Sequence, residues 1–224
     1  MKKILLTIVV GALTMVSSYA QGTVNVQFVS GVTATTNGAT QSGLATGAVG
    51  TYMYALLLNT STTSATSGQA APSSHDPLSS GWVFGGVYMT NTAAGGFING
   101  QATATANANF AQNQWTYYEI VGWSTDGGLY TTWASVSAAL SNGLTGAGLQ
   151  AGSFYGVSAF GNAEPGGGSP SLPTPKLFGT STSTQVPIIV GGITMNLVTP
   201  APEPGTMALA ALGGASLLLF RRRK

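Results

Sequence analysis

The sequence predicts a mainly β protein whose body is an antiparallel β-sandwich or a jelly-roll-like fold. Short runs of alternating apolar and polar residues recur along the body, and clusters of Gly, Asn, Ser and Pro separate them. These runs do not alternate with helical patterns, as they would in a parallel βαβ fold. A body of about 180 residues is long enough to bury a core without disulfides, and the chain has no cysteine.

Several segments of the body have the pattern of strands. The predicted strands are 23–29, 51–58, 82–89, 101–110, 116–123, 153–160 and 186–198. The strongest is 116–123, which alternates between two faces: Tyr118, Ile120 and Gly122 on one, and Tyr117, Glu119, Val121 and Trp123 on the other.

Turn and loop residues connect these strands. Asp126-Gly127-Gly128 is typical of a tight turn, so 129–133 is predicted to return beside 116–123 as a hairpin. One short helix is predicted at 134–141, ended by Asn142-Gly143. The polar segments 59–81 and 162–175 are predicted to be loops.

The charges lie almost entirely at the two ends of the chain. Only 5% of the 224 residues are charged, against about 25% in an average domain. Lys176 is the single cation between residues 21 and 199. The isoelectric point near 9.0 therefore describes the termini, and the body is mildly acidic. This distribution argues against nucleic-acid binding, because phosphates are bound by clustered Lys and Arg.

Residues 1–20 have the pattern of a secretory signal peptide. Lys2 and Lys3 precede the apolar segment 4–16, and small residues end it at Ser18 and Ala20. We expect a signal helix that is cleaved between Ala20 and Gln21. A short buried element of the domain is the alternative interpretation.

Residues 200–224 form a separate C-terminal segment after the body at 21–199. It contains Pro202, Glu203 and Pro204, an apolar run of 14 residues at 207–220, and the basic cluster Arg221, Arg222, Arg223 and Lys224. The run predicts a short transmembrane helix of about 21 Å, less than the hydrocarbon thickness of about 30 Å. The basic cluster should stay on the cytoplasmic side, which leaves the body outside.

These three elements in this order resemble the PEP-CTERM sorting signal of Gram-negative bacteria. The resemblance implies that exosortase recognises Pro202, Glu203 and Pro204 and cuts nearby. It also implies export across the inner membrane and delivery to the cell envelope, outer surface or extracellular matrix. A plain tail anchor is the alternative. The body, through segments such as TYMYALLL and SFYGVSAF, is similar to secreted PEP-CTERM proteins of Verrucomicrobia type, which implies no activity.

Few residues of the body could carry acid–base chemistry. Glu119 and Asp126 are the closest pair of carboxyls in sequence, but Asp126 has the residue type of a turn. His75-Asp76 lies in a Ser-rich loop and is interpreted as a solvated turn. A hydrolase would need two of Glu119, Asp126, Glu164 and His75 within about 10 Å of each other. No metal site and no cofactor are expected.

Aromatic residues are the remaining feature that could bind a ligand. Candidates for contact with a glycan are Trp115, Trp123, Tyr130 and Trp133. Such rings stack on sugars when they are exposed, but they more commonly fill the core of a sandwich. Two or more coplanar exposed rings among Trp115, Trp123 and Trp133 would favour glycan binding, and burial of these rings would favour a structural role.

The sequence therefore predicts a non-enzymatic, exported protein of the cell envelope or extracellular matrix, with a structural or interaction role. Its expected partners are exosortase, the membrane before processing, and extracellular polysaccharide, but no nucleic acid. The alternatives are a carbohydrate-binding module and, more remotely, a glycan hydrolase.

Overall fold

The computed structural model describes residues 22–27, 32–36, 40–66, 68, 70–100, 104–106, 110–142, 148–167, 172–178, 189, 192–198 and 212. The predicted signal peptide, the sorting motif and the basic cluster lie outside these residues. Within the described part of the chain, no helix has the length and apolar character needed to cross a bilayer.

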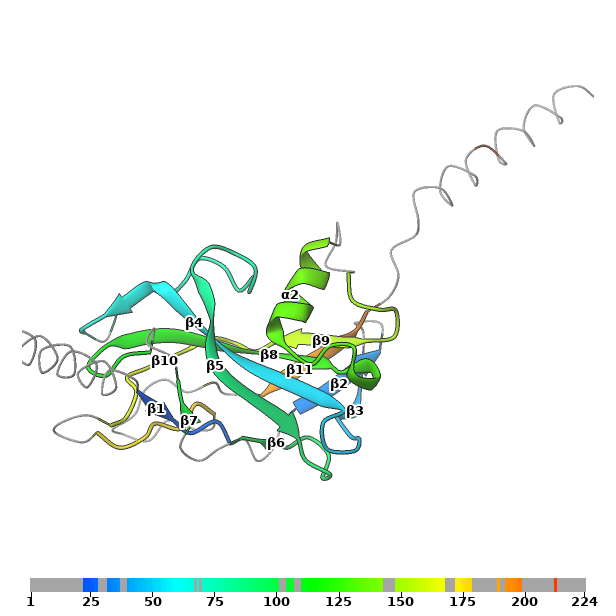
Figure 1. Cartoon of the computed structure of the whole chain (residues 1–224), viewed down its shortest axis with the longest axis horizontal. Helices are drawn as coiled ribbons and strands as arrows, with labels where there is room; N and C mark the ends of the chain where they lie inside the picture. The colour runs from blue at the N-terminus through cyan, green and yellow to red at the C-terminus, as the bar shows by residue number, and fades with distance from the viewer. Residues whose placement is uncertain are drawn as a thin grey trace, which may run out of the picture.

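The described body is built mainly of strands (Figure 1). In chain order the elements are β1 Thr23–Val24, β2 Val32–Thr36, β3 Thr40–Leu44, β4 Tyr52–Ser64, β5 Trp82–Asn91, β6 Ile98–Asn99, β7 Ala104–Thr105, β8 Trp115–Ser124, a 3₁₀ turn Asp126–Gly128, α2 Trp133–Asn142, β9 Phe154–Val157, β10 Gly161–Ala163 and β11 Ile193–Leu197.

One large sheet dominates the fold. Among the described residues it has nine strands, in the order β3-β2-β11-β9-β8-β4-β5-β6, with β10 also paired to β8. Strands β2 and β11 run parallel, and the other described pairs are antiparallel. A second sheet of two strands, β1 and β7, lies below the large sheet in Figure 1.

The central strands β4 and β8 bury both of their faces. Tyr54, Leu56, Tyr118 and Ile120 belong to a core that also contains Val24 and other residues of the β1–β7 layer. The opposite face carries Ala55, Leu57, Val121 and Trp123, which form a second core with α2. The two faces predicted for 116–123 are confirmed, because side chains alternate along a strand.

Helix α2 covers the second core, above β8 and β9 in Figure 1. It begins after Thr132, whose Oγ1 accepts a hydrogen bond from the backbone N–H of Ser135 at 3.2 Å and so caps the helix. Its buried residues are Trp133, Val136 and Leu140, at the spacing of one helical face. The predicted helix at 134–141 is confirmed within one residue at each end.

Several predicted boundaries are wrong. The predicted hairpin is absent, because 129–133 forms no strand and the chain passes from the 3₁₀ turn into α2. Strand β4 runs into the predicted loop 59–81, and β10 lies at the start of the predicted loop 162–175. The sandwich is also unequal, since its second described sheet has only two strands.

Candidate functional site

Glu119 is a buried carboxyl group near the centre of β8. Its side chain has no exposed surface, and it lies opposite Leu57 of β4 on the face that holds the second core. Neither of its carboxyl oxygens has a hydrogen-bond partner in the described structure. A buried polar group without a partner is costly, so this position needs an explanation other than packing.

His75 lies over Glu119. Its Nδ1 is 4.0 Å from Oε2 of Glu119, and 55% of the histidine side chain is exposed. The imidazole stacks on Phe160, with ring centroids 4.1 Å apart, and Phe160 meets Tyr117 edge-on. Trp82 fixes the loop by donating from Nε1 to the carbonyl oxygen of Ser74 at 3.0 Å.

The prediction for His75-Asp76 is therefore half right. Asp76 does form a turn, because its Oδ1 accepts from the backbone N–H of Leu78 at 2.9 Å. His75, by contrast, contacts a buried carboxyl that lies 44 positions further along the chain. The structure thus brings together His75 and Glu119, two of the four residues from which a hydrolase would need a close pair.

Burial changes the proton affinity of Glu119. Loss of solvation raises its pKa from 4.5 to about 9, and the nearby charge of Asp76 contributes to the rise. Glu119 therefore carries its proton at neutral pH and is uncharged. Its contact with His75 is then not an ion pair, and the 4.0 Å separation is too long for a hydrogen bond.

A buried tyrosine hydroxyl lies near Glu119 and Asp76. The Oη of Tyr155 on β9 is buried and has no partner in the described structure. Burial raises the pKa of Tyr155, and Glu119 and Asp76 raise it further. This face of the sheet thus contains two neutral groups that can donate a hydrogen bond and have no acceptor.

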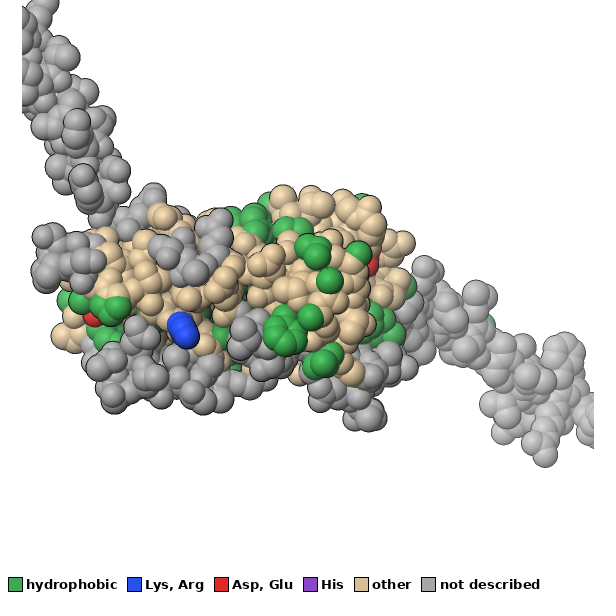
Figure 2. Space-filling model, turned by 90° about the horizontal axis from the view of Figure 1, so that it is seen from below, with side chains coloured by type: hydrophobic (Ala, Val, Ile, Leu, Met, Phe, Trp, Pro, Cys, Tyr) green, Lys and Arg blue, Asp and Glu red, His purple; other side chains and the backbone are tan. Residues whose placement is uncertain are grey.

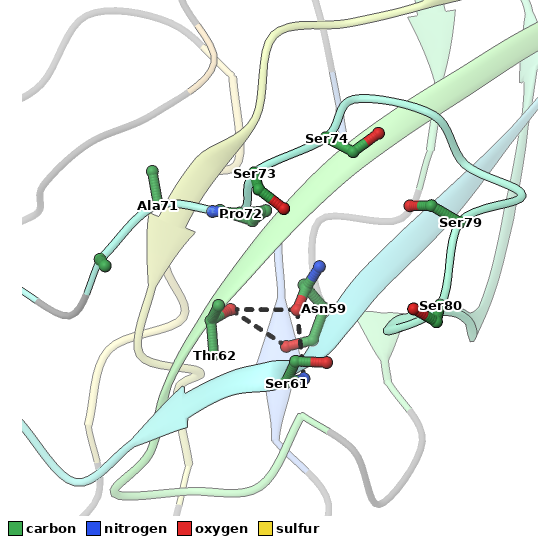
Figure 3. A pocket seen from close by; sticks show the side chains of 10 residues that line it. Asn59, Ser61, Thr62, Ala71, Pro72, Ser73, Ser74, Ser79 and Ser80 are labelled. Atoms are coloured by element: carbon green, nitrogen blue, oxygen red, sulfur yellow. Dashed lines mark hydrogen bonds between the residues drawn. The ribbon is translucent and has the colours of Figure 1, made fainter.

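A pocket lies between the end of β4 and the loop that carries His75 (Figure 3). Its volume is about 370 Å³, and its described lining is uncharged: Asn59, Ser61, Thr62, Ala70, Ala71, Pro72, Ser73, Ser74, Ser79 and Ser80. Oδ1 of Asn59 accepts from the backbone N–H of Ser61 at 3.1 Å and from Oγ1 of Thr62 at 3.3 Å. The pocket is thus lined mainly by hydroxyl groups and one amide.

Asp126, the other carboxyl considered for catalysis, is bound within the fold. Its Oδ1 accepts from Oγ of Ser124 at 2.8 Å, and its Oδ2 accepts from Oγ of Ser153. Ser124 Oγ in turn accepts from the backbone N–H of Phe154 at 2.8 Å. Asp126 therefore ties the 3₁₀ turn to β8 and β9, and its carboxylate has a structural use.

The aromatic residues considered as candidates for contact with a glycan lie mostly in the core. Trp123 has no exposed surface, and Trp133 and Tyr130 are each 8% exposed. Trp123 donates from Nε1 to the carbonyl oxygen of Tyr130 at 2.8 Å beneath α2. Trp115 is half-buried at the start of β8. Three of these four rings thus have no free face for a sugar.

Charged groups are sparse on the described surface. Figure 2 shows a face made largely of uncharged polar side chains and backbone. Among the described residues, Lys176 is the one lysine or arginine. Glu164 is half-buried. In the described part of the chain, no three His, Cys, Asp or Glu residues come together as they would around a metal ion.

Comparison with known proteins gives one finding, at the C-terminus. Residues 200–224 match the PEP-CTERM protein-sorting motif. The motif implies an exported protein that is sorted to the cell surface, with exosortase as its processing partner. The chain matches no curated protein and no solved structure. The similarity of the body to Verrucomicrobia-type proteins therefore stays a prediction.

Proposed function

We propose that the protein is a structural or interaction component of the envelope or extracellular matrix of a Gram-negative bacterium, and that its body is not catalytic. The observation that carries the proposal is the sorting motif at 200–224. In this proposal the signal peptide is removed after Ala20, and the apolar run at 207–220 anchors the chain until exosortase acts.

The uses of the carboxyl groups support a non-catalytic body. Asp126 holds a turn through two serine hydroxyls, and Asp76 forms the turn at Leu78. Glu119 is sealed beneath His75 and has no exposed surface. A general acid must reach the substrate to transfer its proton, so Glu119 cannot act while the loop is in this position.

The sorting motif can be tested by replacing Pro202, Glu203 and Pro204 together with Ala. Proline lacks the backbone N–H that a helix needs and disfavours helix in the residue before it, so we expect the motif to suit a protease, which binds an extended backbone. In a host with exosortase, the parent chain should be cut near residues 202–205 and leave the inner membrane. The variant should stay uncut in the inner-membrane fraction.

A matched control is Thr199→Ala, which lies just before the segment that matches the motif. Thr199→Ala should be processed normally, and both the parent and the triple variant should stay uncut in a host without exosortase. Normal release of the triple variant would reduce the tail to an ordinary anchor and overturn the proposed processing.

A hydrolase is the second candidate, favoured by the approach of His75 to Glu119. A protonated carboxyl with a raised pKa is a common general acid. If the body hydrolysed glycans in this way, Glu119→Gln would abolish the activity while the fold was kept. No difference between parent and variant in the release of reducing sugar would exclude this role for Glu119.

A further inference from the structure

We propose that the serine pocket, which we define as the pocket lined by Asn59, Ser61, Thr62, 70–74 and 79–80, binds a neutral saccharide. The proposal deepens the interaction role proposed above by naming a ligand class and a site. It differs from the aromatic site that the sequence analysis considered as an alternative, since most of those rings are buried.

The lining of the serine pocket selects for neutral polar ligands. Serine and threonine hydroxyls both donate and accept, and the amide of Asn59 does the same. None of the residues that line it in the described structure is charged. An anionic ligand would lose its hydration without gaining a cation, whereas sugar hydroxyls would exchange water for equivalent partners.

The size and arrangement of the pocket suit such a ligand. Its volume of about 370 Å³ is at the lower end of the range for small-molecule sites. In Figure 3, Ser73 and Ser79 from the loop lie across the space from Asn59 and Ser61 on β4. A sugar placed there would meet polar groups from two separate segments of the chain.

Aromatic rings lie beside the pocket. Tyr117 of β8 is directly opposite Asn59 in the strand register, so the two side chains share a face of the sheet. Phe160 meets Tyr117 edge-on, and His75 stacks on Phe160. Ring surfaces beside hydroxyl groups match the two sides of a sugar, which has apolar C–H faces and polar edges.

Glu119 supplies the second independent observation. It lies two residues from Tyr117 on the same face of β8. Since Tyr117 is opposite Asn59, Glu119 is the diagonal neighbour of Asn59 across the β4–β8 pair, with about 7–8 Å between the two Cα atoms. Both of its oxygens are buried and without a partner. A sugar hydroxyl that displaced His75 would give this neutral acid the hydrogen bonds that it lacks.

The test is calorimetric titration of the full-length protein, held in a detergent without a sugar headgroup so that the detergent does not compete. The neutral probes are maltohexaose, cellohexaose and xylohexaose, and the anionic probe is hexagalacturonate. At least one neutral probe should bind, and hexagalacturonate should bind at least about tenfold more weakly, a difference of about 1.4 kcal/mol.

Two variants locate the site. Ser61→Leu and Ser73→Leu each place an apolar side chain at an exposed position of the pocket, and each should weaken binding at least about tenfold. The matched control is Ser141→Leu at the exposed end of α2, which should bind as the parent does. Thermal melting of each variant shows whether its fold is kept. If only one of the two pocket variants folds, its binding alone tests the location of the site.

Three results would overturn the inference: no binding of any neutral probe, equal or tighter binding of hexagalacturonate, or unchanged binding by the pocket variants. The test does not depend on processing, because the full-length chain contains the pocket whether or not exosortase acts on it. Failure of saccharide binding and failure of sorting are therefore seen in separate experiments.

Discussion

Two carboxyl groups of the body have opposite environments. Asp126 accepts hydrogen bonds from the hydroxyls of Ser124 and Ser153, so both of its carboxyl oxygens have partners. Glu119 has no partner in the described structure and is kept neutral by burial, with a pKa raised to about 9. A carboxyl group thus stabilises a turn at Asp126, whereas at Glu119 it has hydrogen-bonding atoms that nothing in the described structure uses.

The raised pKa of Glu119 predicts how stability depends on pH. The folded chain holds this proton up to about pH 9, whereas the unfolded chain releases it near 4.5. Between these values the folded state binds more protons, so the free energy of unfolding falls as pH rises, by at most about 1.4 kcal/mol per pH unit. Glu119→Gln does not titrate and should remove this slope. Urea unfolding followed by tryptophan fluorescence between about pH 5 and about pH 8 tests it, and equal slopes in both proteins would contradict it.

Asp126 should matter for stability in a way that its side-chain chemistry explains. Asp126→Ala loses the hydrogen bonds to both serines. It also places alanine at a φ of 47°, where its side chain can make no hydrogen bond to offset the strain. We expect a loss of about 3 kcal/mol. Asp126→Asn keeps an acceptor and tolerates positive φ, so it should lose about half as much. Thermal melting compares the two, and an equal loss would mean that charge alone is responsible.

At the scale of elements, local patterns predicted the central strands and the helix. Strands β4, β5 and β8 and helix α2 were predicted because their apolar alternation or helical spacing is strong. Strands β2 and β3 were missed, since their sequences VTATT and TQSGL are polar and small. On one edge β2 pairs with its sequence neighbour β3, and on the other it pairs with β11, far along the chain, a pairing that no local signal reports.

The wrong hairpin has a physical cause. Asp126, Gly127 and Gly128 all have positive φ, so they turn the chain away from the sheet instead of folding it back beside β8. Leu129 is 57% exposed, and the chain is drawn into α2 by the burial of Trp133. The Asp-Gly-Gly signal indicated a turn correctly, but the strands on both sides of β8 come from elsewhere: β4, β9 and β10.

The close approach of the paired strands β9 and β11 at Gly156 predicts the effect of a substitution there. A Cβ at Gly156 would lie 2.9 Å from Cα of Met195 and closer still to the carbonyl oxygen of Thr194. Both are backbone atoms of β11, which pairs with β9, so Gly156→Ala should cost about 3 kcal/mol. The control is Gly85→Ala in β5, where the nearest atoms belong to Leu56 at 3.1 Å and the cost should be about 1 kcal/mol. Equal melting temperatures would contradict the difference in packing.

In the candidate site too, the sequence identified individual residues but not which of them lie together in the fold. The sequence singled out both His75 and Glu119, but it did not bring them together, because one lies in a loop and the other in a strand. The serine pocket was hidden for the same reason: its loop and the end of β4 both fell in the predicted loop 59–81. Only the position of the loop over β8, fixed by Trp82 and Ser74, creates the site.

At the scale of the whole molecule, processing should reverse the charge of the protein. Removal of 1–20 and of the tail takes away six of the seven cations. The remaining body has Lys176 against four carboxyls, a formal charge of −3. Because Glu119 keeps its proton at neutral pH, the effective charge of the body should be about −2.

Isoelectric focusing combined with intact mass therefore tests both ends of the chain together. The precursor should focus near pH 9.0, and the processed protein should focus at acidic pH and begin at Gln21. Cleavage anywhere within 202–205 leaves at most one further acid, Glu203, so the shift does not depend on which bond is cut. An exported protein that still focused at basic pH would retain Arg221, Arg222, Arg223 and Lys224. That result would mean that the tail remains as a lasting anchor and that exosortase does not release the body.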